Sequence, residues 1–261
     1  MRTIDLARLS TRMFKTNPMR TWLTILGMGV GTGAVVMLVG LGFGLQQIII
    51  EQIVFGETLL SLGVTSTGAQ GIDITDEVVT EVEKAEHVVD VARLARFPAL
   101  ITYQGLTGNL CLQGAEPAYL RYSGISAAEG DVFTDEDMGD VDSVIISPAV
   151  LKLFGVEDPA TAIGKTVTFR LLLESADVPD QVDEIIIKKP FRIKGITKEE
   201  GVLNALILLP ELRQYVGIKE YDRAQVRVES GEFLPTVEAW LIEKGYRVTA
   251  LSKTVEQASK I

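Results

Sequence analysis

The feature that most constrains this chain is an apolar run from Trp22 to Ile50 that contains no ionisable side chain. The hydrocarbon core of a bilayer is about 30 Å thick and is crossed by about 20 apolar helical residues. At a rise of about 1.5 Å per residue, the run is long enough to cross and to project beyond the far surface. The pattern therefore predicts a transmembrane helix over residues 21–50.

Two other interpretations of the run are disfavoured. A cleaved signal peptide has an apolar stretch of about 7 to 15 residues followed by a small-residue cleavage site. This run is far longer, and no convincing site closes it. A buried helix of a soluble protein rarely exceeds about 25 residues without a charged face. The sequence favours an uncleaved anchor over both.

The residues before the run are basic. Arginines and lysines near the end of a span stay in the cytoplasm, which predicts that residues 1–20 are cytoplasmic and that residues 51–261 form an extracytoplasmic domain. Residues 4–14 have the pattern of an amphipathic helix lying in the membrane interface. The residues expected to anchor the cytoplasmic side are Arg8, Arg12, Lys15, Arg20 and Trp22.

The span is rich in glycine at helical spacing. Small residues four apart let a second helix approach closely in lipid, so the anchor is expected to have a helical partner. The predicted packing positions are Gly27, Gly29, Gly31, Gly33, Gly40 and Gly44. A nucleotide-binding interpretation of Gly29 to Gly33 fails because a dinucleotide fingerprint follows a strand.

Charge and cysteine content narrow the function classes. The chain carries a formal net charge of −10, and outside residues 1–20 it has 20 basic against 34 acidic residues. This balance argues against nucleic-acid or anionic-lipid binding by the outer domain. The single cysteine, Cys111, excludes an internal disulfide and is predicted to be a small core residue.

No catalytic, cofactor-binding or metal site is predicted, and the chain is not expected to be an enzyme. Residues 159–166 end like a phosphate-binding loop, but Pro159 stands where the first glycine belongs. The acidic residues 131–142 lack the order of a calcium loop and are interpreted as a solvated turn. His87 is the only histidine, which leaves no zinc cluster or histidine-assisted nucleophile, so a membrane-anchored hydrolase is disfavoured. His87 itself is expected to be exposed at a helix end.

The remaining pattern predicts an α+β domain, described as an open sheet with helices on one face and divided into two subdomains near residues 114 and 190. Expected strands cover residues 58–66, 88–97, 98–103, 109–113, 143–147, 166–173, 184–188, 191–196, 205–209, 224–228 and 246–251. Expected helices cover residues 76–85, 148–154, a segment beginning at Pro210, and 234–244, the first of them capped by Asp73 or Thr75.

Several segments, in order, resemble MacB-like, FtsX-like permeases of ABC transporters. The segment NPMRTWLTILG at 17–27 and the glycine-rich helix after it are similar to the first transmembrane segment of that family. The outer part is similar to its periplasmic core domain at residues 114–120, 129–133, 163–167, 191–196 and 245–249. The resemblance covers nearly the whole chain, and its specificity lies in the order and spacing of these segments.

The resemblance implies a permease component in the cell membrane that works with a cytoplasmic ATPase, usually as a dimer. It implies coupling of ATP hydrolysis to export, lipoprotein release or mechanical work outside. It also implies a core domain with a porter-like part formed by its two ends and an insertion, here residues 114–190. Family members carry three further membrane helices, so the expectation is an N-terminal half or fragment whose partners are the ATPase, another permease subunit or the C-terminal half, and membrane lipid. The alternative is a single-pass anchored adaptor whose outer domain binds an extracytoplasmic protein.

Overall fold

The computed structural model describes residues 18–66, 73–139, 142–174 and 182–250, and within these it describes no side chains for residues 43–56. The predicted amphipathic helix at residues 4–14 lies outside the described residues. The chain forms two compact units, residues 1–53 and residues 54–261. Each unit is described by itself below.

The elements follow the predicted order. The helices are α2 (Pro18–Leu59), α3 (Asp76–Glu83), α4 (Pro117–Tyr122), α5 (Pro148–Leu153), α6 (Leu209–Leu212) and α7 (Leu234–Glu243), with 3-10 turns η1 (Asp135–Gly139) and η2 (Pro159–Ala162). The strands are β1 (Ser61–Thr65), β2 (Val88–Tyr103), β3 (Leu106–Ala115), β4 (Ala127–Gly130), β5 (Ser143–Ile146), β6 (Thr166–Glu174), β7 (Val182–Thr197), β8 (Asn204–Leu208), β9 (Arg223–Val228) and β10 (Arg247–Ala250).

Helix α2 is one uninterrupted helix from Pro18 to Leu59. Proline suits the first helical position because its missing N–H would have no intrahelical partner there, and Pro18, the first described residue, is helical. Residues 18–42 are long and apolar enough to cross a membrane. The strand expected from residue 58 begins later, at Ser61, because the helix continues through Thr58.

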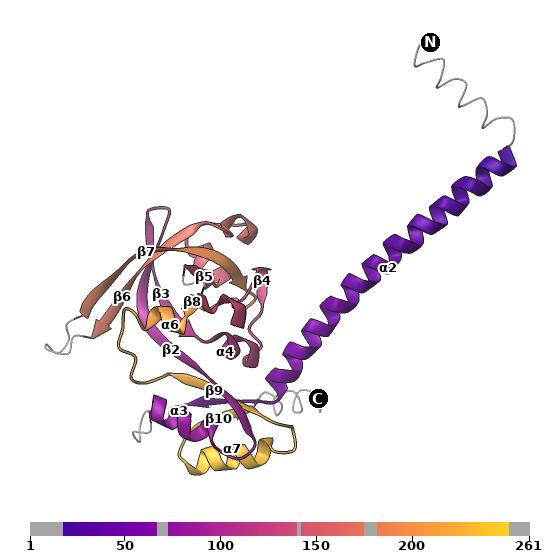
Figure 1. Ribbon diagram of the computed structural model, residues 1–261. Coiled ribbons are helices and arrows are strands. Elements are labelled where there is room, and N and C mark those ends of the chain that lie inside the picture. The colour runs from indigo at the N-terminus through magenta and orange to yellow at the C-terminus, as the bar shows by residue number, and fades with distance from the viewer. Residues whose placement is uncertain (1–17, 67–72, 140–141, 175–181, 251–261) are drawn as a thin grey trace. The chain divides into compact units, whose positions relative to one another are not determined.

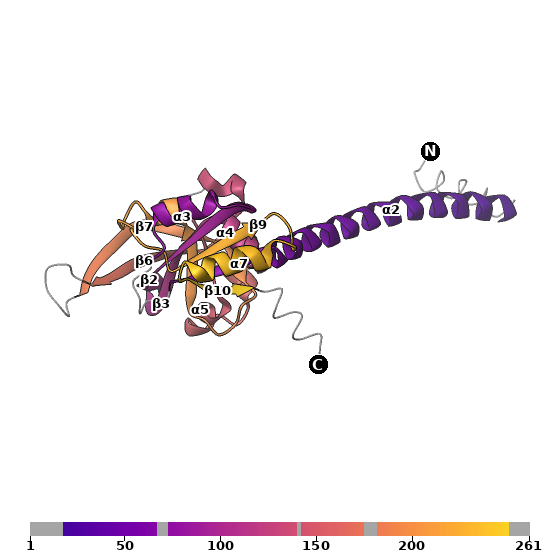
Figure 2. The ribbon, with the colours of Figure 1, turned by 90° about the horizontal axis from the view of Figure 1, so that it is seen from below.

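The two ends of the outer domain form a ferredoxin-like unit. Its four strands lie in the order β10-β1-β9-β2 and are antiparallel. Each of the two segments β1-α3-β2 and β9-α7-β10 is a split βαβ unit, with one strand of the other segment inserted between its strands. Helices α3 and α7 lie together below these strands in Figure 1, and Figure 2 views the same helices from below.

Helices cover both faces of this sheet, so the expectation of helices on one face is wrong. Val91 and Ala95 of β2 pack in one cluster with residues of α3 and α7. Their neighbours Ala92 and Leu94 point to the other face and pack against α4. Successive strand residues alternate between faces, and β2 is apolar at both sets of positions over this stretch.

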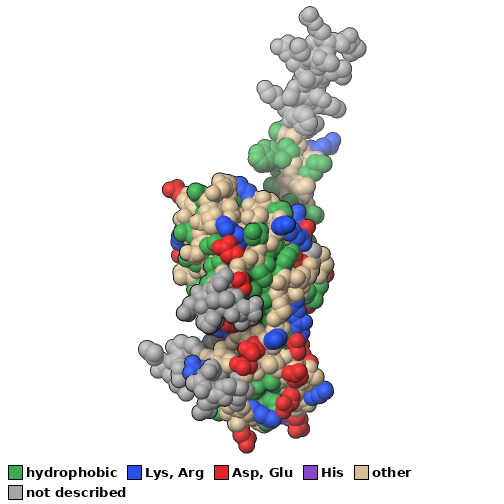
Figure 3. Space-filling model, turned by 90° about the vertical axis from the view of Figure 1, so that its left-hand side faces the viewer, with side chains coloured by type: hydrophobic (Ala, Val, Ile, Leu, Met, Phe, Trp, Pro, Cys, Tyr) green, Lys and Arg blue, Asp and Glu red, His purple; other side chains and the backbone are tan. Residues whose placement is uncertain are grey.

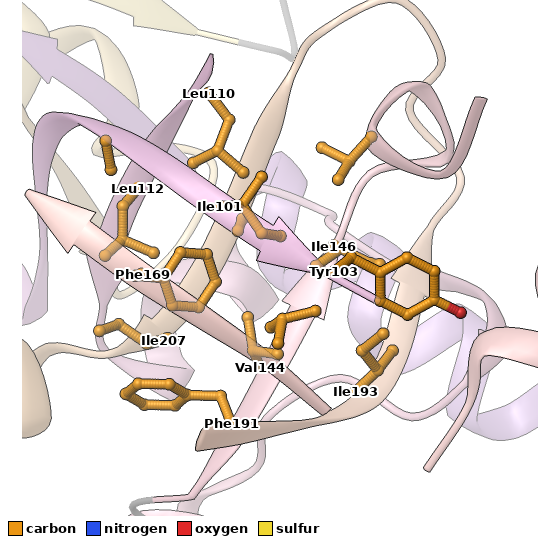
Figure 4. Packing of buried hydrophobic residues seen from close by; sticks show 14 of the residues in the cluster. Ile101, Tyr103, Leu110, Leu112, Val144, Ile146, Phe169, Phe191, Ile193 and Ile207 are labelled. Atoms are coloured by element: carbon orange, nitrogen blue, oxygen red, sulfur yellow. The ribbon is translucent and has the colours of Figure 1, made fainter. Parts of the chain in front are cut away.

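The middle of the chain closes into a barrel, which corrects the prediction of an open sheet. Its strands pair in a ring, β2-β3-β8-β5-β7-β6, and β6 returns to pair with the second half of β2. The interior is filled by alternate residues of all six strands, as expected for a small barrel. Phe169 and Phe191 meet edge to face there, with ring centroids 5.5 Å apart (Figure 4).

The sixteen-residue strand β2 belongs to both parts. Its first half pairs with β9 in the ferredoxin-like unit, and its second half pairs with β6 in the barrel. The barrel draws strands from within and from outside residues 114–190. The chain thus has the predicted α+β fold, with an N-terminal apolar helix followed by a sheet-rich domain.

Candidate functional site: the ion-pair cluster at the end of helix α2

The described apolar part of α2, residues 18–42, is not covered by other described residues. None of residues 18–42 is buried, and Trp22 is 69% exposed. The hydroxyls of Thr24 and Thr32 donate to the carbonyls of Arg20 and Met28, at 2.9 and 2.7 Å. Polar groups satisfied within the helix are what a lipid environment requires.

The predicted packing glycines lie on an open surface. A Cβ built on Gly27, Gly29, Gly31, Gly33 or Gly40 would meet nothing within 4 Å. Gly44 lies in the stretch 43–56, whose surroundings are not described. Of the predicted anchoring residues, Arg20 and Trp22 are exposed, whereas Arg8, Arg12 and Lys15 lie outside the described residues. Helix packing and anchoring stay predictions.

The last turn of α2, which belongs to the compact unit of residues 54–261, carries a carboxylate held by two arginines. One Glu57 oxygen accepts from Arg121 Nε at 3.0 Å, and the other lies 3.3 Å from Arg227 Nη1. The Glu57 side chain is only 17% exposed. A carboxylate at a helix C-terminus is opposed by the helix dipole, so the two guanidinium groups provide the compensating charge.

The two arginines also enclose an aromatic ring. The guanidinium carbons of Arg121 and Arg227 lie 5.5 and 5.7 Å from the centroid of the Tyr122 ring, within cation–π range. The Tyr122 hydroxyl donates to Asp90 at 2.7 Å. Burial, together with the Asp90 carboxylate, raises the pKa of Tyr122, so the phenol stays protonated.

Arg121 connects α2 to the turn η1 as well. Its Nη1 donates to Asp135 at 2.6 Å. Burial disfavours the charged guanidinium, but the carboxylates of Asp135 and Glu57 outweigh burial and raise the pKa of Arg121. The charge is therefore permanent, and the cluster joins α2, α4, β9 and η1.

Close packing of Thr58 against the backbone of residues 121–124 also connects the end of α2 to α4. The buried Thr58 hydroxyl donates to the Arg121 carbonyl at 3.2 Å. Gly124 has a φ of +69°, and a Cβ there would lie 3.2 Å from the Thr58 hydroxyl. Glycine is required because a side chain would be strained and crowded at this position.

A second charged cluster lies at the start of α3. Asp76 accepts from the Tyr221 hydroxyl at 2.7 Å and from Arg93 and Arg213, each at 3.1 Å. Burial works to raise the pKa of Asp76, but the Tyr221 hydrogen bond and the two arginines lower it. Arg93 also pairs with Glu116 through its side chain, at 2.5 Å. This cluster joins α3, β2, α6 and the loop before β9.

Two residues singled out in the sequence, His87 and Cys111, lie in surroundings that differ from those predicted. His87 is not an exposed helix-end residue: its side chain is 26% exposed and its ring stacks on Phe233, with centroids 3.5 Å apart. His87 has a φ of +65°, and Phe233 is the residue directly before α7. Cys111 is partly exposed, since its strand position points to the outer side of the barrel.

Over their described residues, the two motif-like segments form 3-10 turns, η1 and η2. Residues 159–162 form the turn η2 and lead into strand β6, not into the helix that a phosphate loop needs. Asp137 in the acidic turn pairs with Lys194 and accepts a hydrogen bond from the backbone N–H of Thr134. Among the described residues, no group of three potential ligands could hold a metal ion.

Sequence reasoning missed Glu57, Arg121 and Arg227. One signal was available: Glu57 is an acidic residue in the last turn of a long apolar helix, where a cation is preferred. Its partners lie about 64 and 170 positions further along the chain (Arg121 and Arg227), and nothing local marks them.

The comparisons with known proteins agree on one family. Residues 21–244 match the family described as MacB-like periplasmic core domain. The macrolide export ATP-binding/permease protein MacB of Neisseria gonorrhoeae is 26% identical over 207 residues, which are 76% of this chain and 29% of that protein. The protein of the same name from Bdellovibrio bacteriovorus is 26% identical over 258 residues, covering 91% of this chain and 37% of that protein.

Two solved structures share the fold. The periplasmic region of MacB from Actinobacillus actinomycetemcomitans has a TM-score of 0.55 at 14% identity, covering 79% of this chain and 95% of that one. The extracellular domain of YknZ, a noncanonic ABC-type transporter from Gram-positive bacteria, has a TM-score of 0.52 at 18% identity, covering 72% and 99%.

The chain spans about three tenths of the length of the first curated relatives that it matches. The match to the family nonetheless begins inside the apolar helix and runs to the end of α7. It therefore includes the ion-pair cluster at Glu57, the barrel, and the ferredoxin-like unit except for β10. The chain belongs to the family of MacB-like periplasmic core domains.

Proposed function

We propose that the chain is the N-terminal part of an ABC transporter permease, with residues 1–20 in the cytoplasm and the α+β domain outside the membrane. In this proposal a partner ATPase hydrolyses ATP, and helix α2 carries the resulting movement to the outer domain. The work done outside is export, lipoprotein release or mechanical transmission to another protein.

The observation that carries the proposal is the Glu57 cluster. Helix α2 has no break between Pro18 and Leu59, so a displacement along its axis reaches its last turn. There Glu57 is bound by residues of α4 and β9, and Thr58 is buried against α4. A helix that only anchored the domain to the membrane would not need these buried ion pairs and hydrogen bonds at its end.

Membership of this family supports the proposal that an ATPase is a partner. The uncovered glycine surface of α2 supports the proposal that a second helix packs against it. Gly27 and Gly31 lie on one helix face, where a close helix–helix approach buries backbone rather than side chains. We infer that this face contacts another permease subunit or the C-terminal half of the permease.

Affinity purification from native membranes tests the proposal. The chain is solubilised mildly, and the proteins that accompany it are identified by mass spectrometry. An ATPase with a complete phosphate-binding loop, recovered together with a multi-span partner, supports the proposal. Recovery of extracytoplasmic proteins alone would contradict it and favour the anchored adaptor.

The helix contact is tested separately by Gly27→Leu combined with Gly31→Leu. We expect the two leucines to abolish association of α2 with its partner helix, measured by disulfide crosslinking in membranes. Val30→Leu with Val39→Leu is the control, since it places two leucines elsewhere in the same span without filling the positions of Gly27 and Gly31. Unchanged association in the glycine variant would remove this part of the proposal.

A further inference from the structure

The ferredoxin-like unit has a hollow of about 970 Å³ at the ends of β1, β9 and β10. None of the charged residues that line this hollow belongs to the Glu57 cluster or the Asp76 cluster. Its floor is formed by strand residues, and its wall by the loop of residues 217–222. A hollow of this size is at the upper end of the range for ligand-binding pockets.

Two arginines stand on the floor of this hollow. Arg223 of β9 and Arg247 of β10 are both in register with Thr65 of β1, one on each side of it. Residues in register across a sheet project from the same face. Both arginines are exposed, and neither side chain has a recorded hydrogen bond or ion pair within the described part of the chain.

The neighbouring residues of β1, β9 and β10 on the same face of the sheet leave space beside the two arginines. Gln225 and Thr249 flank Gly63 in the same register. A Cβ on Gly63 would lie 3.4 Å from the Gln225 amide nitrogen and 3.5 Å from the Thr249 carbonyl oxygen, so the glycine keeps the space between them open. Guanidinium groups only donate hydrogen bonds, and their geometry matches a carboxylate.

The carboxylates that line the hollow do not neutralise this pair. Asp222 is occupied by Arg96, whose Nε lies 3.2 Å from one of its oxygens and whose backbone N–H donates to the other at 2.6 Å. Asp73 and Glu220 line the hollow from its loops, and the structure records no ion pair between them and the two arginines. Residues 67–72, which follow the hollow in sequence, contain no ionisable side chain.

A shallow, mostly apolar hollow, widely open to solvent, adjoins the first one and shares Arg96, Phe97 and Asp222 with it. Its other lining residues include Pro98, Cys111 and Leu203. Pro98 and Cys111 are in register, and Pro98 lies on the same face of β2 as Leu94, the partner of Arg223. The two hollows therefore lie on one face of the sheet.

Together the hollows cross the sheet from β10 to β3. At about 4.8 Å between neighbouring strands, this path is about 19 Å long. An extended polypeptide covers that length with about six residues. A single small anion would fill only the end at the two arginines.

We propose that this groove binds an extended acidic segment of a partner protein. Carboxylates of the segment pair with Arg223 and Arg247, and an apolar side chain of the segment enters the hollow beside Cys111. Charge complementarity carries the choice of occupant: in a chain of net charge −10, the described lining of the first hollow has four basic against three acidic side chains, and its two exposed arginines lie on either side of β1. On the face of the molecule shown in Figure 3, by contrast, acidic side chains gather around α3. The proposal goes beyond the coupling role and does not depend on it.

Site-specific photocrosslinking of the full chain in native membranes tests the proposal. A benzophenone amino acid replaces Thr249 at the charged end of the groove or Asn109 at its apolar end. The control position is Thr80, which is exposed on α3 away from the groove. The crosslinked peptides are sequenced by mass spectrometry.

We expect both groove positions to crosslink to one partner segment that carries two or more carboxylates within about six residues. Arg223→Glu combined with Arg247→Glu should lower the yield from Thr249 at least tenfold, whereas Arg223→Lys with Arg247→Lys should retain most of it. Because both side chains are exposed, the thermal unfolding of either variant should match that of the parent, which separates lost binding from misfolding.

Four outcomes would overturn the proposal. They are crosslinks no stronger than those from Thr80, crosslinked segments without carboxylates, a yield that charge reversal leaves unchanged, and crosslinks to this chain's own residues 251–261 alone. None of these outcomes bears on whether an ATPase accompanies the chain, so failure here is distinguishable from failure of the proposed function.

Discussion

The barrel and the ferredoxin-like unit share strand β2 but are stabilised in different ways. In the barrel, six strands point apolar side chains into one enclosed cluster that includes Phe169 and Phe191. The ferredoxin-like unit has its own apolar cluster under α3 and α7. It also has charged clusters at its periphery, around Glu57 and Asp76.

The barrel is suited to be a rigid scaffold, whereas the ion pairs of the Glu57 and Asp76 clusters are suited to connect elements that move. Apolar burial is non-directional and makes a closed barrel hold its shape. Ion pairs between half-buried side chains depend on position and contribute less to stability. We therefore expect substitutions in the barrel interior to act mainly on folding, and substitutions in the charged clusters to act mainly on how elements are connected.

The largest expected effect tests the barrel interior. Phe191→Ala removes a fully buried ring that contacts Phe169, and we expect a loss of about 3–5 kcal/mol in the free energy of unfolding. Denaturant unfolding of the full chain in detergent, followed by Trp240 fluorescence in a Trp22→Phe background, measures it. Trp240 reports from the ferredoxin-like unit, so a shift in its transition shows that β2 couples the two parts.

Leu106→Ala is the control for that measurement, because Leu106 is exposed at the tip of the β2–β3 hairpin. Its transition should stay at the parent value. If Phe191→Ala left the Trp240 transition unchanged while circular dichroism showed a separate early step, the two parts would unfold independently.

The second prediction concerns the backbone packing of the barrel. A Cβ on Gly195 of β7 would lie 2.1 Å from the carbonyl oxygen of Asp131, and this backbone cannot move without disturbing the pairing of β4 with β7. Gly195→Ala should therefore lower the free energy of unfolding by about 1–3 kcal/mol. Gly139→Ala, where a Cβ would meet nothing within 4 Å, should have little effect. Equal midpoints for the two variants in urea would contradict the prediction.

The third prediction concerns the end of α2. Glu57→Gln keeps the shape of the side chain but leaves Arg121 and Arg227 facing a neutral group, and we expect a loss of about 1–3 kcal/mol in unfolding free energy. Glu200→Gln is the matched control. Glu200 pairs with Lys152, both side chains are exposed, and such pairs contribute about 0–1 kcal/mol.

The connection itself is measured by hydrogen exchange of residues 57–61 in the same two proteins. Faster exchange in Glu57→Gln, at denaturant concentrations where β2 remains protected, would show local loosening of the helix end. Exchange that matched the Glu200→Gln control would remove Glu57 from the proposed path of movement.

The smallest effect concerns pH. The pKa of Asp76 is lowered from its ordinary value of 3.8, so its ion pairs contribute stability above that value and lose it as pH falls through the lowered pKa. Because the Asp76 side chain is 55% exposed, we expect a contribution below about 1 kcal/mol. Asp76→Asn should be less stable than the parent at pH 7 and equally stable at strongly acidic pH. A difference that persisted unchanged into acid would contradict the charge-based explanation.

Local patterns predicted the elements of this chain well. The α3 segment begins after Thr75, whose hydroxyl accepts from the Val78 N–H, because a cap, an acidic first turn and helical spacing are all local in sequence. The β2–β3 hairpin was likewise marked by alternation on both sides of a glycine-containing turn. The expectation of two separate strands at residues 184–188 and 191–196 is wrong, since the single strand β7 runs from Val182 to Thr197.

The membrane-length apolar helix, the α+β class and the family were all predictable from the sequence, since each depends on composition, periodicity or the order of segments. The return of β6 to β2, which closes a barrel, and the contact of Glu57 with Arg121 and Arg227 became visible in the folded chain alone. These contacts join residues far apart in the chain. Their energies depend on a geometry that exists only after the intervening strands have folded.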